Sequence, residues 1–194
     1  MDVEQFKGGA NRNFSYLVYN QDQAVVIDPF SEIKPYLTRA DELGVEIIGV
    51  LNTHTHADHT AGNKAFRQEG ITRLQGTISL GDTELKEIPT PGHTNDSVCY
   101  YADKQLFTGD TLFVGKIGYA RDQEQAKKQY KSLHKLLKEL PKETIVYPGH
   151  DFGEQPTSTL QEEAANNPFL QRDFKEFWHL KTHWDEYKQQ HEIT

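Results

Sequence analysis

The sequence contains a single cysteine, Cys99, among its 194 residues, so no disulfide can form within the chain. Scarce cysteine is typical of proteins in reducing compartments. The first residues, MDVEQFKGG, are acidic and polar, and they lack the basic and apolar regions of a secretory signal. No apolar run approaches the roughly 18 residues that span a bilayer. We therefore expect a cytoplasmic protein that does not enter a membrane.

Basic residues are also few, because 21 Lys and Arg face 29 Asp and Glu, for a formal net charge of −8. No cluster of basic side chains stands out, whereas proteins that bind nucleic acid or anionic membranes usually carry one. The composition therefore predicts neither of these partners and favours a small-molecule substrate. It makes no prediction of an oligomeric state.

Low-complexity segments, repeats and Gly/Ser linkers are absent, and the length favours one domain over residues 1–194. Apolar periodicity and turn residues predict strands at Phe14–Tyr19, Ala24–Ile27, Ile47–Leu51, Glu84–Ile88, Val98–Tyr101, Gln105–Phe107 and Thr144–Tyr147. The expected helices are one capped by Ser31 that ends near Leu43, Ala61–Glu69, Gln123–Leu140, one capped by Thr159 that ends before Pro168, and a last one at about 172–190 that packs on the domain. Strands interleaved with helices indicate an α/β protein.

Five of the nine histidines lie in three short loops, and each loop follows a predicted strand. The first loop, 53–60, contains His54, His56 and His59, and the other two contain His93 and His150. A fourth loop, 108–111, follows a strand in the same way and adds Asp110. In α/β proteins, ligands bind at the carboxyl ends of the strands. We therefore expect the four loops to meet in one crevice.

The spacing in the first loop suits metal binding. His54 and His56 occupy alternate positions, which point to one side of an extended segment. Asp58 and His59 lie about a turn further on, where the chain enters a helix, so they can face a neighbouring point. Imidazole and carboxylate ligands suit zinc, iron or manganese. One short loop can therefore supply ligands to two divalent metal ions, of which zinc is the expected one and iron or manganese the alternatives.

The motifs THTHADH, TPGHT, TGDTLF and YPGHD, in this order, resemble the metallo-β-lactamase superfamily. The resemblance covers nearly the whole chain and implies an αβ/βα sandwich of two sheets flanked by helices. It implies a dinuclear metal centre with ligands at seven positions. The first metal would take His54, His56 and His93, the second would take Asp58, His59 and His150, and Asp110 would bridge the two.

Two further stretches, GDTLFVGKIG and TSTLQEEAANNPFL, resemble the branch of glyoxalase II-type hydrolases and persulfide dioxygenases. The first activity implies a metallo-hydrolase of a thioester, hydroxyacylglutathione hydrolase-like, in which a metal-bridging hydroxide attacks and the catalytic Asp58 orients it. The alternative is an iron-dependent persulfide (sulfur) dioxygenase with one iron on residues matching His54, His93 and Asp110. Residues 115–122 fit the dioxygenase pattern poorly, which favours the hydrolase.

Three residues outside the ligand set have candidate roles. Lys116 and Tyr119 lie near positions that contact glutathione in glyoxalase II-type enzymes, although they could be ordinary loop residues. Asp28, at the end of a predicted strand, could orient a ligand histidine or simply form a turn before Pro29. The helical C-terminal domain that helps to hold glutathione in glyoxalase II has no counterpart here, so the substrate could be a glutathione conjugate or another thiol conjugate.

Three other classes of function agree less well with the sequence. A secreted β-lactamase is disfavoured by the missing signal peptide. A metal-dependent nuclease is disfavoured by the acidic balance. A binding module without catalysis is disfavoured because a competent residue occupies every ligand position.

Overall fold

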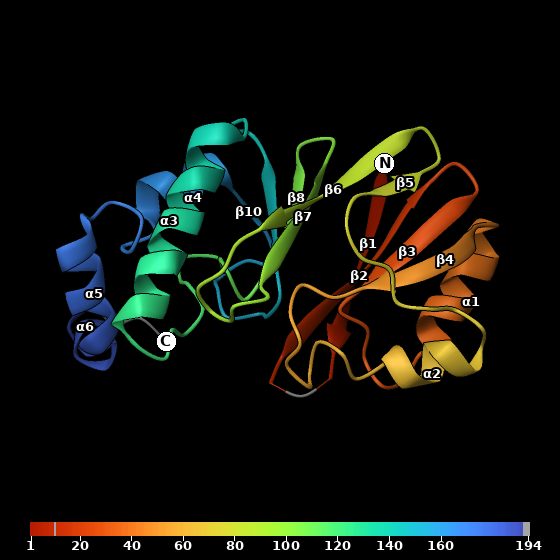
Figure 1. The fold of residues 1–194 in the computed structure, drawn as a ribbon, viewed down its shortest axis with the longest axis horizontal. Coiled ribbons are helices and arrows are strands. Elements are labelled where there is room, and N and C mark those ends of the chain that lie inside the picture. The colour runs from red at the N-terminus through yellow and green to blue at the C-terminus, as the bar shows by residue number, and fades with distance from the viewer. Residues whose placement is uncertain (10, 192–194) are drawn as a thin grey trace.

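Two β-sheets pack against each other, and helices cover the outer face of each sheet (Figure 1). The computed structural model describes residues 1–9 and 11–191. The strands are β1 Asp2–Gly8, β2 Asn13–Asn20, β3 Gln23–Ile27, β4 Glu46–Leu51, β5 Ile78–Leu80, β6 Thr83–Pro89, β7 Val98–Ala102, β8 Gln105–Gly109, β9 Ile145–Pro148 and β10 Ser158–Thr159. The helices are α1 Lys34–Leu43, α2 Asn63–Gln68, α3 Gln123–Glu139, α4 Leu160–Asn166, α5 Phe174–Thr182 and α6 Trp184–Gln190. This arrangement confirms the expected αβ/βα sandwich.

Both sheets follow the same plan. The four-stranded sheet has the order β1-β2-β3-β4, and its one parallel pair, β3 and β4, is connected through α1. The six-stranded sheet has the order β10-β9-β8-β7-β6-β5, and its one parallel pair, β8 and β9, is connected through α3. Parallel neighbours need such a crossover, because a tight turn can connect only antiparallel strands.

Each sheet is buried on both faces. In β2, Tyr16 and Val18 pack into the core between the two sheets, while Leu17 packs toward α1 and α2. In β8, Phe107 belongs to the central core and Leu106 to the core beneath α3 and α5. Sheets covered on both faces have strands that are apolar on both sides. This is why the strands read as nearly continuous apolar runs in the sequence.

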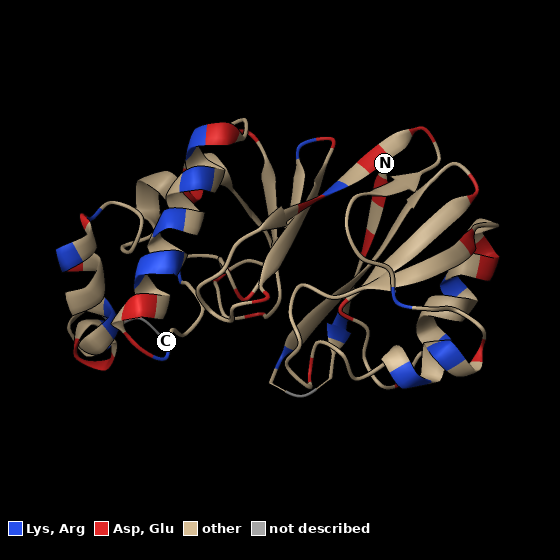
Figure 2. Cartoon of the chain, viewed as in Figure 1, with Lys and Arg blue, Asp and Glu red and all other residues tan. Residues whose placement is uncertain are grey.

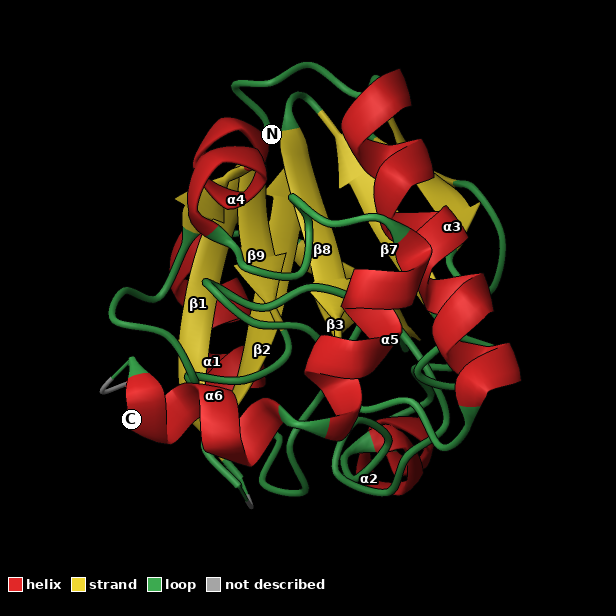
Figure 3. Ribbon diagram, turned by 90° about the vertical axis from the view of Figure 1, so that its left-hand side faces the viewer, coloured by secondary structure: helices red, strands yellow, loops and turns green. Residues whose placement is uncertain are grey.

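The longest helix, α3, matches its prediction closely. Asp122 caps it by accepting a hydrogen bond from the backbone N–H of Gln125 at 2.9 Å. The predicted capping box at Thr159 is also present at the start of α4. Figure 3 shows α3 and α5 side by side in front of the six-stranded sheet.

Two predictions about helix ends were wrong. Ser31 does not cap α1, which begins at Lys34, and Glu32 accepts the hydrogen bond from the Lys34 backbone N–H instead. The last helix is interrupted at His183, so α5 and α6 replace the single helix expected at about 172–190. The Thr182 hydroxyl binds the carbonyl of His179 at 2.9 Å, and the turn allows Trp184 to pack on Phe169.

Three strands were absent from the prediction. β1 is a half-exposed edge strand without regular apolar alternation, and it is held by its register against β2. β5 and β10 have three and two residues, which is too short for a periodic signal.

Charged residues are dispersed over the helices and turns, with basic and acidic side chains interspersed, and the strands carry few of them (Figure 2). Within residues 1–9 and 11–191, no helix is long and apolar enough to cross a bilayer.

Candidate metal centre

The seven predicted ligands lie together at one edge of the two sheets. Each of their loops follows a strand that the structure contains, namely β4, β6, β8 and β9. The loops meet at the lower centre of Figure 1, where Figure 2 shows acidic segments in loops of both halves. Backbone hydrogen bonds tie the sheets together here, from Val98 N to Thr53 O and from Phe14 N to Gly149 O, both at 2.8 Å.

The first group of candidate ligands consists of His54, His56 and His93. His56 Nδ1 lies 2.9 Å from His54 Nε2 and 3.1 Å from His93 Nε2. Zinc–nitrogen bonds of about 2.0–2.1 Å in a tetrahedron place the nitrogens about 3.3 Å apart. The three nitrogens therefore have nearly the spacing that one zinc ion requires.

The second group consists of Asp58, His59 and His150. The Nε2 atoms of His59 and His150 lie 3.2 Å apart. Asp58 Oδ2 lies 3.7 Å from the first and 3.6 Å from the second. This group could hold a second ion beside the first.

Asp110 faces both groups with different oxygens. Its Oδ1 lies 3.2 Å from His59 Nε2 and 3.3 Å from His150 Nε2, in the second group. Its Oδ2 lies 3.4 Å from His93 Nε2, in the first group. Oδ1 is buried, and no atom of the described residues meets it in hydrogen-bond geometry. A carboxylate so placed suits a bridge between two cations.

In each of these histidines, one ring nitrogen faces the centre and the other, the outer nitrogen, faces away from it. The hydrogen bond of the outer nitrogen determines which nitrogen carries the proton and where the lone pair points. The backbone carbonyls of Tyr119 and Asn11 accept from Nδ1 of His93 at 2.8 Å and Nδ1 of His150 at 3.0 Å. A carbonyl can only accept, so each Nδ1 carries the proton and each Nε2 presents a lone pair to the centre. Lone pairs that converge within about 3 Å repel one another unless a cation lies between them, so the donor set fits a metal centre.

Asp28 takes part in the hydrogen bonds that orient two of the candidate ligands. Its Oδ2 lies 2.8 Å from His59 Nδ1 and also accepts from the Thr53 hydroxyl at 2.6 Å. Since that hydroxyl donates to Asp28, its oxygen accepts from His54 Nδ1, 3.2 Å away. Asp28 is 3% exposed and has a left-handed φ of 51°, a conformation that Asp tolerates better than most residues. It thus lies where it can orient one ligand directly and another through Thr53.

Burial and charge shift the pKa values of the ligands in opposite directions. Burial, then the neighbouring His59, lowers the pKa of His54 to about 4. Burial also lowers the pKa of His59, but the carboxylates of Asp28 and Asp110 outweigh it and raise that pKa to about 11. For Asp110, burial raises the pKa, yet His150 and His59 hold it well below its usual range. The same carboxylates that attract a proton to His59 would attract a metal ion.

Gly149, in one of the two Pro-Gly-His motifs, must be a glycine because there is no room for a side chain. A Cβ on Gly149 would lie 2.7 Å from Asp110 Oδ1 and 2.8 Å from His59 Cε1. Any larger residue would displace two candidate ligands, so the glycine lets the backbone of one loop approach the side chains of two others.

The two candidate substrate residues lie in the loop that follows Asp110. Lys116 is half-buried, and its Nζ donates to the carbonyl of Phe152 at 2.9 Å. The Tyr119 side chain is 71% exposed, while its backbone carbonyl holds His93. Their contact with a substrate stays a prediction.

Sequence reasoning missed several residues around the centre. Asn13 is buried and donates from Nδ2 to Asp58 Oδ2 at 3.0 Å. Phe152 stacks on His150 with 1° between the ring planes and 4.7 Å between the centroids. Asn13 lies far from the ligand motifs in the sequence. Phe152, two residues after His150, could have been suspected from its position alone.

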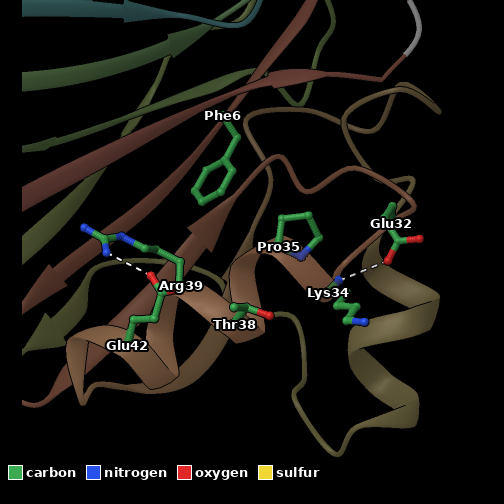
Figure 4. A pocket seen from close by; sticks show the side chains of 7 residues that line it. All are labelled: Phe6, Glu32, Lys34, Pro35, Thr38, Arg39 and Glu42. Atoms are coloured by element: carbon green, nitrogen blue, oxygen red, sulfur yellow. Dashed lines mark hydrogen bonds and ion pairs between the residues drawn. The ribbon is translucent and has the colours of Figure 1, made fainter.

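A surface hollow of about 460 Å³ lies elsewhere, between β1 and α1 (Figure 4). None of the seven candidate ligands lines it. Two of its charged side chains, Arg39 and Glu42, pair with each other at 3.0 Å. The hollow therefore offers no chemistry comparable with that of the metal centre.

Comparison with known proteins agrees with this geometry. The hydroxyacylglutathione hydrolase of Polaromonas sp. is 36% identical over 193 residues, which cover 86% of this chain and 73% of that protein. The human mitochondrial persulfide dioxygenase ETHE1 is 33% identical over 187 residues, covering 84% and 74%. The crystal structure of ETHE1 from Myxococcus xanthus matches with a TM-score of 0.84 at 30% identity and covers 94% of this chain and 90% of that one. The family model described as "Metallo-beta-lactamase superfamily" matches residues 8–75 and 71–150. The chain is therefore an enzyme of the metallo-beta-lactamase superfamily, in the branch that includes glyoxalase II-like hydrolases and persulfide dioxygenases.

Proposed function

We propose that the protein is a metal-dependent thioester hydrolase, similar in activity to hydroxyacylglutathione hydrolases, with two divalent ions, preferably zinc. His54, His56 and His93 would hold one ion, and Asp58, His59 and His150 the other. The observation that carries the proposal is Asp110, whose two oxygens face the two groups separately. A centre for a single ion has no need of this division.

The bound ions would lower the pKa of water and polarise the carbonyl of the substrate. The protein's own contribution begins with Asp58. Asn13 donates to Asp58 Oδ2, which leaves Oδ1 to accept a hydrogen bond from the attacking water. Burial raises the pKa of Asp58, but the hydrogen bond from Asn13, supported by His59 and His150, lowers it overall. The carboxylate therefore stays ionised at neutral pH and can orient the attacking water or hydroxide.

A thioester suits this machinery because its leaving group needs little help. Thiols have an ordinary pKa of about 8.5, so a thiolate departs with little protonation. An amide would require a general acid beside the leaving nitrogen. We propose that the acyl carbonyl lies over the two groups and that the thiol portion extends toward Lys116 and Tyr119. Lys116 would attract an anionic thiol such as glutathione.

A second candidate is an iron-dependent persulfide dioxygenase. The 33% identity with human ETHE1 and the TM-score of 0.84 with the Myxococcus xanthus ETHE1 structure favour it. In this alternative His54, His93 and Asp110 would hold one iron, and the second group would not be needed for catalysis.

The experiment that separates the candidates compares the wild type with Asp58→Ala. Zinc-loaded protein is assayed for thioester hydrolysis and iron-loaded protein for oxygen uptake with glutathione persulfide. We expect two ions per wild-type chain by elemental analysis, rapid hydrolysis, and loss of hydrolysis with one ion in Asp58→Ala. Asp41→Ala, on the exposed side of α1, is the control.

Rapid oxygen uptake that persists in Asp58→Ala, with negligible hydrolysis by the wild type, would reject the hydrolase and establish the dioxygenase. One ion per chain at saturation would reject the dinuclear centre.

We also infer that residues 1–194 form one domain, because ligands from both sheets are needed for each ion site. From the single cysteine, which is buried, we propose a reducing compartment such as the cytoplasm.

A further inference from the structure

A lysine of α5 points into the protein rather than toward solvent. Lys181 Nζ donates to the carbonyl of Gly118 at 2.8 Å and to Gln129 Oε1 at 2.9 Å. The amine of this half-buried residue also lies 5.8 Å and 5.6 Å from the ring centres of Phe169 and Phe177, which belong to the core beneath α3 and α5. Lysine is seldom placed among apolar side chains, because removing its amine from water is unfavourable. The inward position of the Lys181 amine therefore suggests that its hydrogen bonds have a role in the protein.

The Gly118 carbonyl is a shared acceptor, since Gln129 Nε2 in α3 also donates to it at 3.0 Å. Two helices, α3 and α5, thus hold the same peptide group of the loop between β8 and α3. The loop is pressed against the metal centre at this point, because a Cβ on Gly118 would lie 1.8 Å from the carbonyl oxygen of Asp110. A small rotation of this peptide would be transmitted to its neighbours.

The next residue connects the loop to a candidate ligand. The Tyr119 carbonyl accepts from His93 Nδ1 at 2.8 Å, which fixes both the proton and the orientation of the ring. Gly118 points its carbonyl toward Lys181, and Tyr119 points its carbonyl toward His93. Each of these two hydrogen bonds restrains the segment that makes the other.

We propose that Lys181 is a positioning residue of the metal centre, which holds the Gly118 carbonyl so that the Tyr119 carbonyl orients His93. The proposal rests on the ligand role of His93 in the proposed function. It also gives α5 a role at the active site, although this helix contributes no ligand. Burial lowers the pKa of Lys181 to about 7. The ammonium and the amine both have the two N–H groups that Gly118 and Gln129 accept, so positioning does not depend on the charge.

The central variant is Lys181→Met, which keeps much of the length of the apolar stem and removes the donor. Zinc affinity is measured by competition with a chelator, and the visible spectrum of cobalt-substituted protein reports the geometry around His93. We expect zinc affinity in the first group to fall by about tenfold or less, because Lys181 acts through the loop, whereas direct hydrogen-bond partners of ligand histidines are worth about 10–100-fold. The cobalt spectrum should change as well, and kcat should fall more than KM rises.

Two controls separate positioning from general destabilisation. Lys175→Met changes an exposed lysine on the same helix and should leave zinc affinity unchanged. Leu180→Ala removes a buried neighbour in α5 that makes no contact of this kind with the loop. It should lower the Tm and retain the affinity and the cobalt spectrum.

Gln129→Met provides a second test, because it removes both the other donor to Gly118 and the side-chain acceptor that holds Lys181 Nζ. It remains informative even if Lys181→Met does not fold. It should weaken the same ion, and the effects of the two substitutions should not add in the double variant. Wild-type affinity in folded Lys181→Met or Gln129→Met would overturn the inference. The inference would also be overturned if Leu180→Ala lost as much zinc affinity as Lys181→Met while lowering the Tm by the same amount. A wild type that binds no ion would instead reject the proposed function.

Discussion

The two groups of candidate ligands differ in how they are built. In the second group, His59 and His150 are 0% and 2% exposed, and a carboxylate and a backbone carbonyl hold their outer nitrogens. In the first group, His56 is exposed, and the outer nitrogens of His54 and His93 are held by neutral oxygens, the Thr53 hydroxyl and the Tyr119 carbonyl. The difference indicates that the histidines of the second group are the more firmly held and that the first group is accessible to solvent at His56.

The chemistry of the partners leads to the same conclusion. A carboxylate behind a histidine increases the basicity of the ring and restricts its rotation more than a hydroxyl does. His59 alone has such a carboxylate, Asp28, as its direct partner among the candidate ligands. We therefore expect the two ions to bind with unequal affinity, the second group being the tighter one.

Removing Asp110 should have the largest effect on metal content and turnover, because its two oxygens face both groups of candidate ligands. We expect Asp110→Ala to lose both ions and to reduce kcat by more than about 100-fold. That is the upper end of the loss when a hydrogen-bond partner of a metal ligand is replaced, and Asp110 is itself a candidate ligand. Metal content and turnover would be measured on the same preparation, with Asp41→Ala as control. Near-wild-type turnover would show that Asp110 is not a bridge.

Asp28→Asn should have an intermediate effect and should separate the two groups. The amide oxygen can still accept from His59, but the charge is lost, so we expect the affinity of the second ion to fall about 10–100-fold. The affinity of the first ion should fall by a smaller factor, because Asp28 reaches His54 only through Thr53. Thr53→Val removes only the relay to His54 and should weaken mainly the first ion, by a smaller factor. Calorimetric titration of metal-free protein with zinc resolves the two steps. Identical profiles for the two variants would argue against the difference between the groups.

Lys116→Ala should have the smallest effect. If Lys116 attracts an anionic thiol, its loss should raise KM about two- to fivefold, as for an exposed ion pair of about 1 kcal/mol, and should leave kcat nearly unchanged. Steady-state kinetics would compare glutathione thioesters with thioesters of an uncharged thiol, and Lys138→Ala would be the control. Equal kinetics for both substrates in both variants would remove Lys116 from the substrate site.

Much of this protein follows from local sequence. The apolar runs of β2, β3, β4 and β8 predicted strands because each face of each strand is buried. The capping box at Thr159 predicted the start of α4, and apolar periodicity predicted α3. The histidine and aspartate motifs pointed to the metal centre because the spacing of ligands within a short loop is a local property. The position of each motif after a strand predicted that they would meet.

Only the tertiary structure decided what lies behind the ligands. The hydrogen bonds of Asn13 to Asp58 and of Lys181 to Gly118 span 45 and 63 residues, and neither side chain belongs to a recognisable motif. The interruption between α5 and α6 depends on the packing of Trp184 against Phe169, which helical periodicity does not encode. The edge strand β1 exists because its backbone pairs with β2 rather than because of its own side chains. The sequence by itself determined the chemistry of the centre, whereas its rigidity and orientation come from contacts between distant segments, which exist only after both sheets have packed together.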